Sequence, residues 1–142
     1  MRKLKPQKPD FDQIAKFIAG ARKKLESARK TLIIDEEASY QLAYEAMLKA
    51  SLGFMLSFGV RPRSLPGHHV TIIEFAETHL AKESKHLISI FDRMRRKRNQ
   101  AIYEVGGFIC TTEARQALMS AGLYLETISE AIQKKNPQIK LL

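Results

Sequence analysis

The chain has 142 residues, 44% hydrophobic and 27% charged, a balance typical of one globular domain with its own core. Lysine and arginine outnumber aspartate and glutamate by 24 to 15, and the formal charge of +9 favours nucleic acid, an acidic protein or an anionic surface over basic partners. The single cysteine excludes an internal disulfide, and the longest apolar-rich stretch, residues 46–59, is too short for a membrane span, so we expect a reducing, cytoplasmic setting.

The first nine residues are predicted to be a basic, disordered tail without the apolar segment of a secretory signal. A single domain is predicted over residues 10–136, followed by a short tail at 137–142. Asp10 is a good N-cap, and a first helix is predicted from there to Leu32. Its apolar residues recur at spacings of three and four, which gives one buried stripe: Phe11, Ile14, Ile18, Ala21, Leu25, Ala28 and Leu32.

Acidic residues at 35–37 predict the start of a second helix, because negative charge is favourable in a first helical turn. Residues 42–58 are apolar on nearly every side, so this helix is predicted to be the central and most buried one. Gly59 should end it. The following "GVRPRSLPG", residues 59–67, holds two prolines and two glycines and is predicted to be a connecting loop.

A short helix is predicted over residues 68–80 and a longer one over 83–103, ended by "VGG". Thr111 or Thr112 should cap a last helix that closes at "KKNPQ", residues 134–138. Cys110 precedes it and is interpreted as a small buried residue. No stretch alternates with period two for long enough to predict a strand. The fold class is therefore all-α: an up-and-down bundle of four long helices plus one short helix.

The run "RMRRKR", residues 93–98, raises the question of whether it is a solvated face or an anion site. Leu87, Phe91, Met94 and Ile102 define an apolar stripe, and Arg98 falls where this pattern requires an apolar residue. A guanidinium on such a seam is costly unless it is paired. Two alternatives remain open, namely that Arg98 pairs with a carboxylate such as Glu45 or that it lines a cleft that receives an anion.

Asn99 and Tyr103 lie beside Arg98 on the same predicted helix. Arginine, amide and phenol groups around one groove suit a phosphate with its ribose or base. The neighbouring Arg95 and Arg96 point elsewhere and belong to a mostly solvated face. His79, Glu83 and His86 could share a face only if their connection were helical, and we predict no metal site and no cofactor.

Two segments resemble HEPN domains. "RNQAIY", residues 98–103, resembles their motif of Arg, a polar residue, three variable residues and His. "AYEAMLKASLGFMLSFGVRPRSLPGHH", residues 43–69, resembles the second helix and following "G-x-R-P-x-S-x-x-G-H" loop of the bacterial and archaeal branch. The resemblance spans roughly residues 28–132.

The resemblance implies a four- or five-helix bundle that forms a homodimer, with the two motif copies lining a shared cleft. Many HEPN domains are metal-independent endoribonucleases that act as toxins beside a nucleotidyltransferase antitoxin; others bind nucleotides or are inactive. Carried over by position, Arg98 would hold the scissile phosphate and Asn99 would orient it. Arg98 and Tyr103 are then the catalytic candidates, and Arg95 and Arg96 join Arg98, Asn99 and Tyr103 as candidates for binding RNA or a nucleotide.

The chain departs from the family pattern at Tyr103, where active relatives have His. A free tyrosine titrates near pH ~10 and is a poor base at neutral pH. His86 lies about 18 Å from Arg98 along one helix. His68 or His69 could reach the cleft from a partner chain, although a capping or packing role at the loop is the preferred interpretation.

Three functions follow from these residues. The leading one is RNA or nucleotide binding at the Arg-Asn-x3-Tyr motif, with endoribonuclease toxin activity as its enzymatic form. The alternative is a catalytically inactive interaction module that pairs with a nucleotidyltransferase. A third is a general nucleic-acid binder that uses the basic tail and helix faces.

Overall fold

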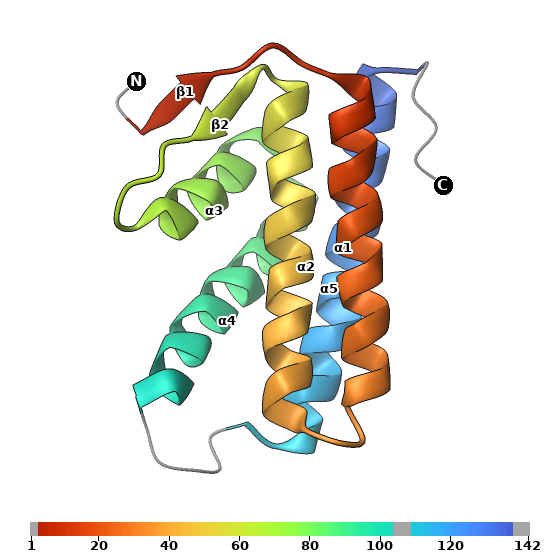
Figure 1. Cartoon of the computed structure of the whole chain (residues 1–142), viewed down its shortest axis with the longest axis vertical. Helices are drawn as coiled ribbons and strands as arrows, with labels where there is room; N and C mark the ends of the chain where they lie inside the picture. The colour runs from red at the N-terminus through yellow and green to blue at the C-terminus, as the bar shows by residue number, and fades with distance from the viewer. Residues whose placement is uncertain (1–2, 104–108, 138–142) are drawn as a thin grey trace.

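The computed structural model describes residues 3–103 and 109–137, and at residues 102 and 103 the backbone alone. In this part of the chain the helices are α1 (Phe11–Thr31), α2 (Glu36–Ser57), α3 (His68–His79), α4 (Lys85–Tyr103) and α5 (Thr111–Lys135). One 3-10 turn, η1 (Lys82–Ser84), leads into α4. The all-α prediction of four long helices and one short helix is confirmed (Figure 1). The predicted break at "VGG" lies outside the described residues.

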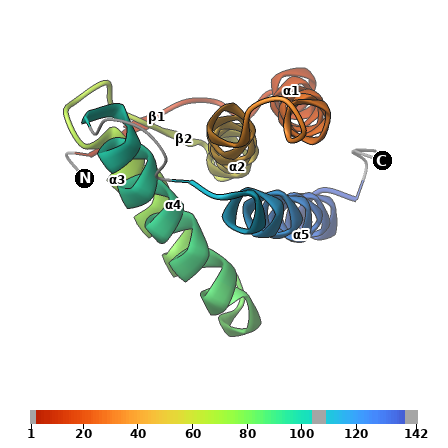
Figure 2. The same ribbon diagram turned by 90° about the horizontal axis from the view of Figure 1, so that it is seen from below.

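The helix α2 is the centre of the bundle, as predicted. It contacts all four other helices, α1, α3, α4 and α5. Seen from below, α1 and α2 lie over α5, while α3 and α4 lie on the side of α2 that faces away from α1 (Figure 2). The small residue Gly53 lets α1 approach closely, since a Cβ there would lie 3.1 Å from the Cβ of Phe17. The site-bearing helix α4 therefore packs against a helix that is itself held on several sides.

A small antiparallel sheet corrects two predictions. The strands β1 (Leu4–Pro6) and β2 (Val60–Pro62) pair with Leu4 opposite Pro62 and Pro6 opposite Val60. Part of the predicted disordered tail and part of the predicted loop are thus strands. Three-residue strands are too short to show a period of two, and each is stabilised by a segment distant in sequence.

The predicted cap at Asp10 is confirmed, and the helix start predicted at the acidic residues 35–37 is capped by Asp35. The Asp10 carboxylate accepts from the amides of Asp12 and Gln13, and the Asp35 carboxylate accepts from the amide of Ala38. The prediction for the last helix is wrong, because Cys110 is its N-cap and is exposed rather than buried.

Side chains from α2 and α5 meet at the start of α5. The Thr111 hydroxyl donates to Glu36 Oε1 at 3.0 Å, while Thr111 itself is the first helical residue after the cap. The contact ties the first turn of α5 to the first turn of α2.

The apolar stripe predicted for α4 is buried as far as its side chains are described, and the side chain of Ile102 lies outside the described residues. Leu87, Phe91 and Met94 are all 5% exposed or less. The Phe91 ring lies between two buried tyrosines, 5.6 Å from the ring centre of Tyr44 on α2 and 5.2 Å from that of Tyr124 on α5. These aromatic contacts fix α4 against both neighbours. Among the described residues, no helix combines the length and the apolar character that crossing a membrane requires.

Candidate anion-binding site

Arg98 lies on the seam of α4, one helical turn beyond Met94, and is partly buried. Its guanidinium carbon is 5.5 Å from the ring centre of Tyr44, a cation–π distance. Its Nε is buried and has no hydrogen-bond partner among the described residues. Because buried polar groups are nearly always paired, an unpaired guanidinium N–H is the feature of this site that most needs explaining.

The alternative in which Glu45 neutralises Arg98 is wrong. Glu45 Oε1 lies 3.4 Å from Lys24 Nζ on α1 and is paired there. Within residues 3–101 and 109–137, Arg98 forms no ion pair with a carboxylate. Among the described residues, the contact found for the positive charge of Arg98 is therefore the ring of Tyr44.

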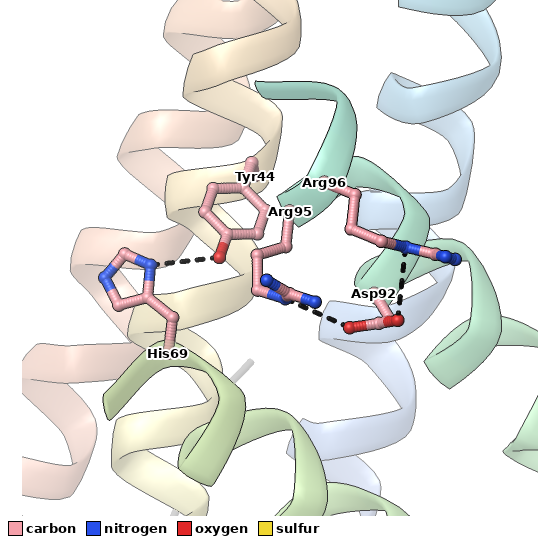
Figure 3. Close-up of polar contacts among 5 residues, drawn as sticks. All are labelled: Tyr44, His69, Asp92, Arg95 and Arg96. Atoms are coloured by element: carbon pink, nitrogen blue, oxygen red, sulfur yellow. Dashed lines mark hydrogen bonds and ion pairs between the residues drawn. The ribbon is translucent and has the colours of Figure 1, made fainter. Parts of the chain in front are cut away.

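The structure brings His69 to this site within one chain, at the start of α3. The hydroxyl of the fully buried Tyr44 lies 3.0 Å from His69 Nδ1, as drawn in Figure 3. The sequence analysis gave two possible roles for His69, namely packing at the loop or reaching a cleft from a partner chain. It packs at the loop, but in doing so it joins the same tyrosine that lies under Arg98.

The hydrogen bond between Tyr44 and His69 has a preferred direction. Burial raises the pKa of Tyr44 to about 12, against the opposing charges of Arg98 and Arg95, so the phenol stays protonated at neutral pH. Its hydroxyl has one described polar neighbour, His69 Nδ1, and satisfies its proton by donating there. In the tautomer that accepts this proton, the neutral imidazole carries its own proton on Nε2.

Burial lowers the pKa of His69 below its ordinary value of 6.5, and the nearby charges of His68, Arg98 and Arg95 lower it further. His69 is therefore mainly neutral at pH 7. The unfolded chain binds a proton more readily than the folded one, so stability contributed by this group is present above about pH 6.5 and is lost as pH falls.

Arg98→Met is expected to raise the pKa of His69, because one of the nearby positive charges disappears while the packing volume is kept. An NMR pH titration of the imidazole signals measures this shift. Arg96→Met is the matched control, since Arg96 is 63% exposed and does not contribute to the shift. Equal shifts in the two variants would contradict the proximity of Arg98 and His69.

Two of the predicted RNA-binding arginines share one carboxylate. Arg95 Nε donates to Asp92 Oδ1 at 3.0 Å, and Arg96 Nε lies 3.5 Å from Asp92 Oδ2 (Figure 3). Arg95 is 21% exposed and its charge acts on both Tyr44 and His69, whereas Arg96 points mostly into solvent. Arg95 thus belongs to the site with Arg98, and Arg96 belongs to the solvated face.

The remaining predicted residues are less well joined to this cluster. Asn99 is exposed beside Arg98. Tyr103 ends α4, and the prediction about its side chain lies outside the described residues. Lys97 Nζ is 3.2 Å from Glu113 Oε2 and joins α4 to α5.

In the described part of the chain no three His, Cys, Asp or Glu side chains cluster as metal ligands, and His79 instead stacks on Phe75.

The pairing of Tyr44 with His69 is the part of the site that sequence reasoning missed. Both residues stand in the segment that carries the family resemblance, in "AYEA" and "GHH". The twenty-four residues between them include a helix end and a strand. Spacing alone therefore could not bring them together. No protein-family model matches this chain, and comparison with curated proteins finds no significant match.

Proposed function

We propose that this chain is a HEPN-like domain that binds RNA or a nucleotide through a phosphate group at Arg98. The observation that carries the proposal is the partly buried guanidinium of Arg98, whose Nε lacks a hydrogen-bond partner among the described residues and whose charge lacks a carboxylate there. A phosphate offers oxygens that match the N–H groups of an arginine. Binding it would remove the cost of the unpaired buried donor.

The neighbouring groups have complementary roles in this proposal. Arg95, held by Asp92, adds a second positive charge, and His69 donates from Nε2. Asn99 is exposed next to Arg98 and can contact the ribose or base. A role for Tyr103 rests on the family resemblance alone. The N–H groups of Arg95, His69 and Asn99 are hydrogen-bond donors and therefore favour binding of an anion.

We place binding ahead of RNA cleavage. Metal-independent cleavage needs a base for the ribose 2′-hydroxyl, and the motif has Tyr103 where active relatives have His. The lowered pKa of His69 leaves its imidazole mainly neutral at pH 7, but donation from Tyr44 to Nδ1 leaves Nε2 protonated and unable to accept that proton. Endoribonuclease toxin activity, a homodimer and an antitoxin partner are part of the family expectation, whereas the cytoplasmic setting is proposed from the single cysteine.

A second candidate is an inactive interaction module that docks a nucleotidyltransferase. An apolar groove of about 810 Å³ between α1 and α5 favours it. Met119 and Leu123 on its wall are 65% and 51% exposed, so the groove offers two neighbouring apolar side chains that a docked protein could cover. RNA binding that depends on Arg98 would count against this candidate as the main function.

The proposed function is tested by fluorescence anisotropy with a short labelled oligouridine, together with a gel analysis of the incubated RNA. We expect saturable binding that weakens with salt and leaves the RNA intact. Uridine monophosphate should compete. Absence of binding at low salt would refute the proposal, and cleavage products that vanish in His69→Gln would replace it with the enzymatic form.

A further inference from the structure

A second basic site lies on the face formed by α1, α2, β2 and the start of α3. It is a groove of about 620 Å³, which we name the basic groove. These elements lie together at the end of the bundle that carries the two-stranded sheet (Figure 1). Its charged and titratable lining residues come from four separate segments: Lys16, Lys49, Arg61, Arg63, His68 and His69.

The charge of the basic groove is not balanced locally. The residues that line it include no aspartate or glutamate. None of its four lysine and arginine side chains forms an ion pair within the described residues. Four cations that converge on one concavity without a carboxylate create a strong local positive potential. Such a groove is suited to a ligand that carries several negative charges.

The basic groove is connected to the Arg98 site through His69. This residue lines the groove and also makes the hydrogen bond to Tyr44, the tyrosine under Arg98. A polyanion that lies in the groove therefore has one of its contacts in common with the phosphate site.

The uncharged part of the groove narrows the choice of polyanion. Its lining includes the half-buried apolar residues Phe17, Leu48 and Leu52 and the exposed imidazole of His68. Apolar lining residues and an exposed ring favour unstacked bases, which a single strand offers and a duplex does not. An acidic peptide would use the cations but gain little from these surfaces.

We propose that the basic groove holds the backbone of single-stranded RNA, one phosphate of which occupies the Arg98 site. This inference rests on the proposed function and extends it, because it selects a strand with several phosphates over a free mononucleotide. Lys16 and Lys49 on one side and Arg61 and Arg63 on the other contact successive phosphates.

The test compares oligouridine binding by wild type and Lys16→Gln/Lys49→Gln across a salt series. Each lost phosphate contact reduces the slope of log K against log salt by about 0.7, so the double variant should lose about 1.4. At about 0.1 M salt, affinity should fall roughly 25-fold. Lys82→Gln/Lys85→Gln, an equal loss of charge at two exposed positions around the start of α4, should bind like wild type.

The outcomes separate the two proposals. If the groove variant binds like the control while Arg98→Met does not bind, the groove inference is wrong and the proposed function stands. If Arg98→Met binds normally and the groove variant does not, the Arg98 site is wrong and the groove alone is the RNA site. Polyglutamate that displaces the RNA at equal charge concentration would show a site for acidic protein instead. If the Lys16→Gln/Lys49→Gln variant does not fold, the Arg61→Gln/Arg63→Gln variant takes its place in the same comparison.

Discussion

Arg98→Met is expected to weaken binding of a short oligouridine roughly 10- to 100-fold, because hydrogen bonds to a charged group contribute about 1.5–3 kcal/mol. Methionine keeps much of the side-chain volume above Tyr44 and removes only the donors and the charge. Fluorescence anisotropy titrations give the two dissociation constants. The dissociation constant of Arg98→Lys should lie between those of wild type and Arg98→Met, since an ammonium keeps the charge but not the fork of parallel donors.

The control for Arg98 is another arginine of the same helix. Arg93 is exposed, and Arg93→Met removes the same formal charge. Loss of one exposed charge should change affinity by no more than about threefold, because salt screens it. If both methionine variants lose the same affinity, the RNA responds to net charge alone and Arg98 has no special role.

Phe91→Ala is expected to lower the free energy of unfolding by roughly 3–5 kcal/mol, the usual cost of removing a buried aromatic ring. Phe91 is fully buried and lies between Tyr44 and Tyr124, so its loss leaves a cavity where α4 meets α2 and α5. Urea unfolding monitored by circular dichroism measures the change.

Phe11→Ala provides the matched comparison. Phe11 is 44% exposed at the start of α1, and its removal should cost roughly 1 kcal/mol or less. Equal costs at the two positions would mean that Phe91 does not support α4 in the way its contacts imply.

Much of the fold was predictable because each helix carries its own local signals. Asp10 and Asp35 supply caps, and the apolar spacing marks the buried faces of α1, α4 and α5. The two-stranded sheet was not predictable, because Leu4–Pro6 becomes a strand only through pairing with Val60–Pro62. The cap of α5 was missed because cysteine is not among the usual capping residues, and the helix starts earlier than either threonine would allow as a cap.

Of the residues that form the site, Arg98 was the one that the sequence pattern identified. A cation on the apolar stripe of α4 identified Arg98, and the structure leaves its buried Nε without a partner in the described residues. Tyr44 and His69 come from α2 and α3, and their meeting depends on how three helices pack. The basic groove also depends on how the helices and the strand pack, because its six charged and titratable residues come from four segments that no sequence period links.

The most direct measurement follows the Nε–H signal of Arg98 by NMR while uridine monophosphate is added. The signal is assigned by its absence in Arg98→Met. A phosphate that binds the guanidinium should shift it in a saturable way, together with the imidazole signals of His69. If the Nε–H and His69 signals both stay unchanged while the nucleotide or RNA binds elsewhere, Arg98 is not an anion site.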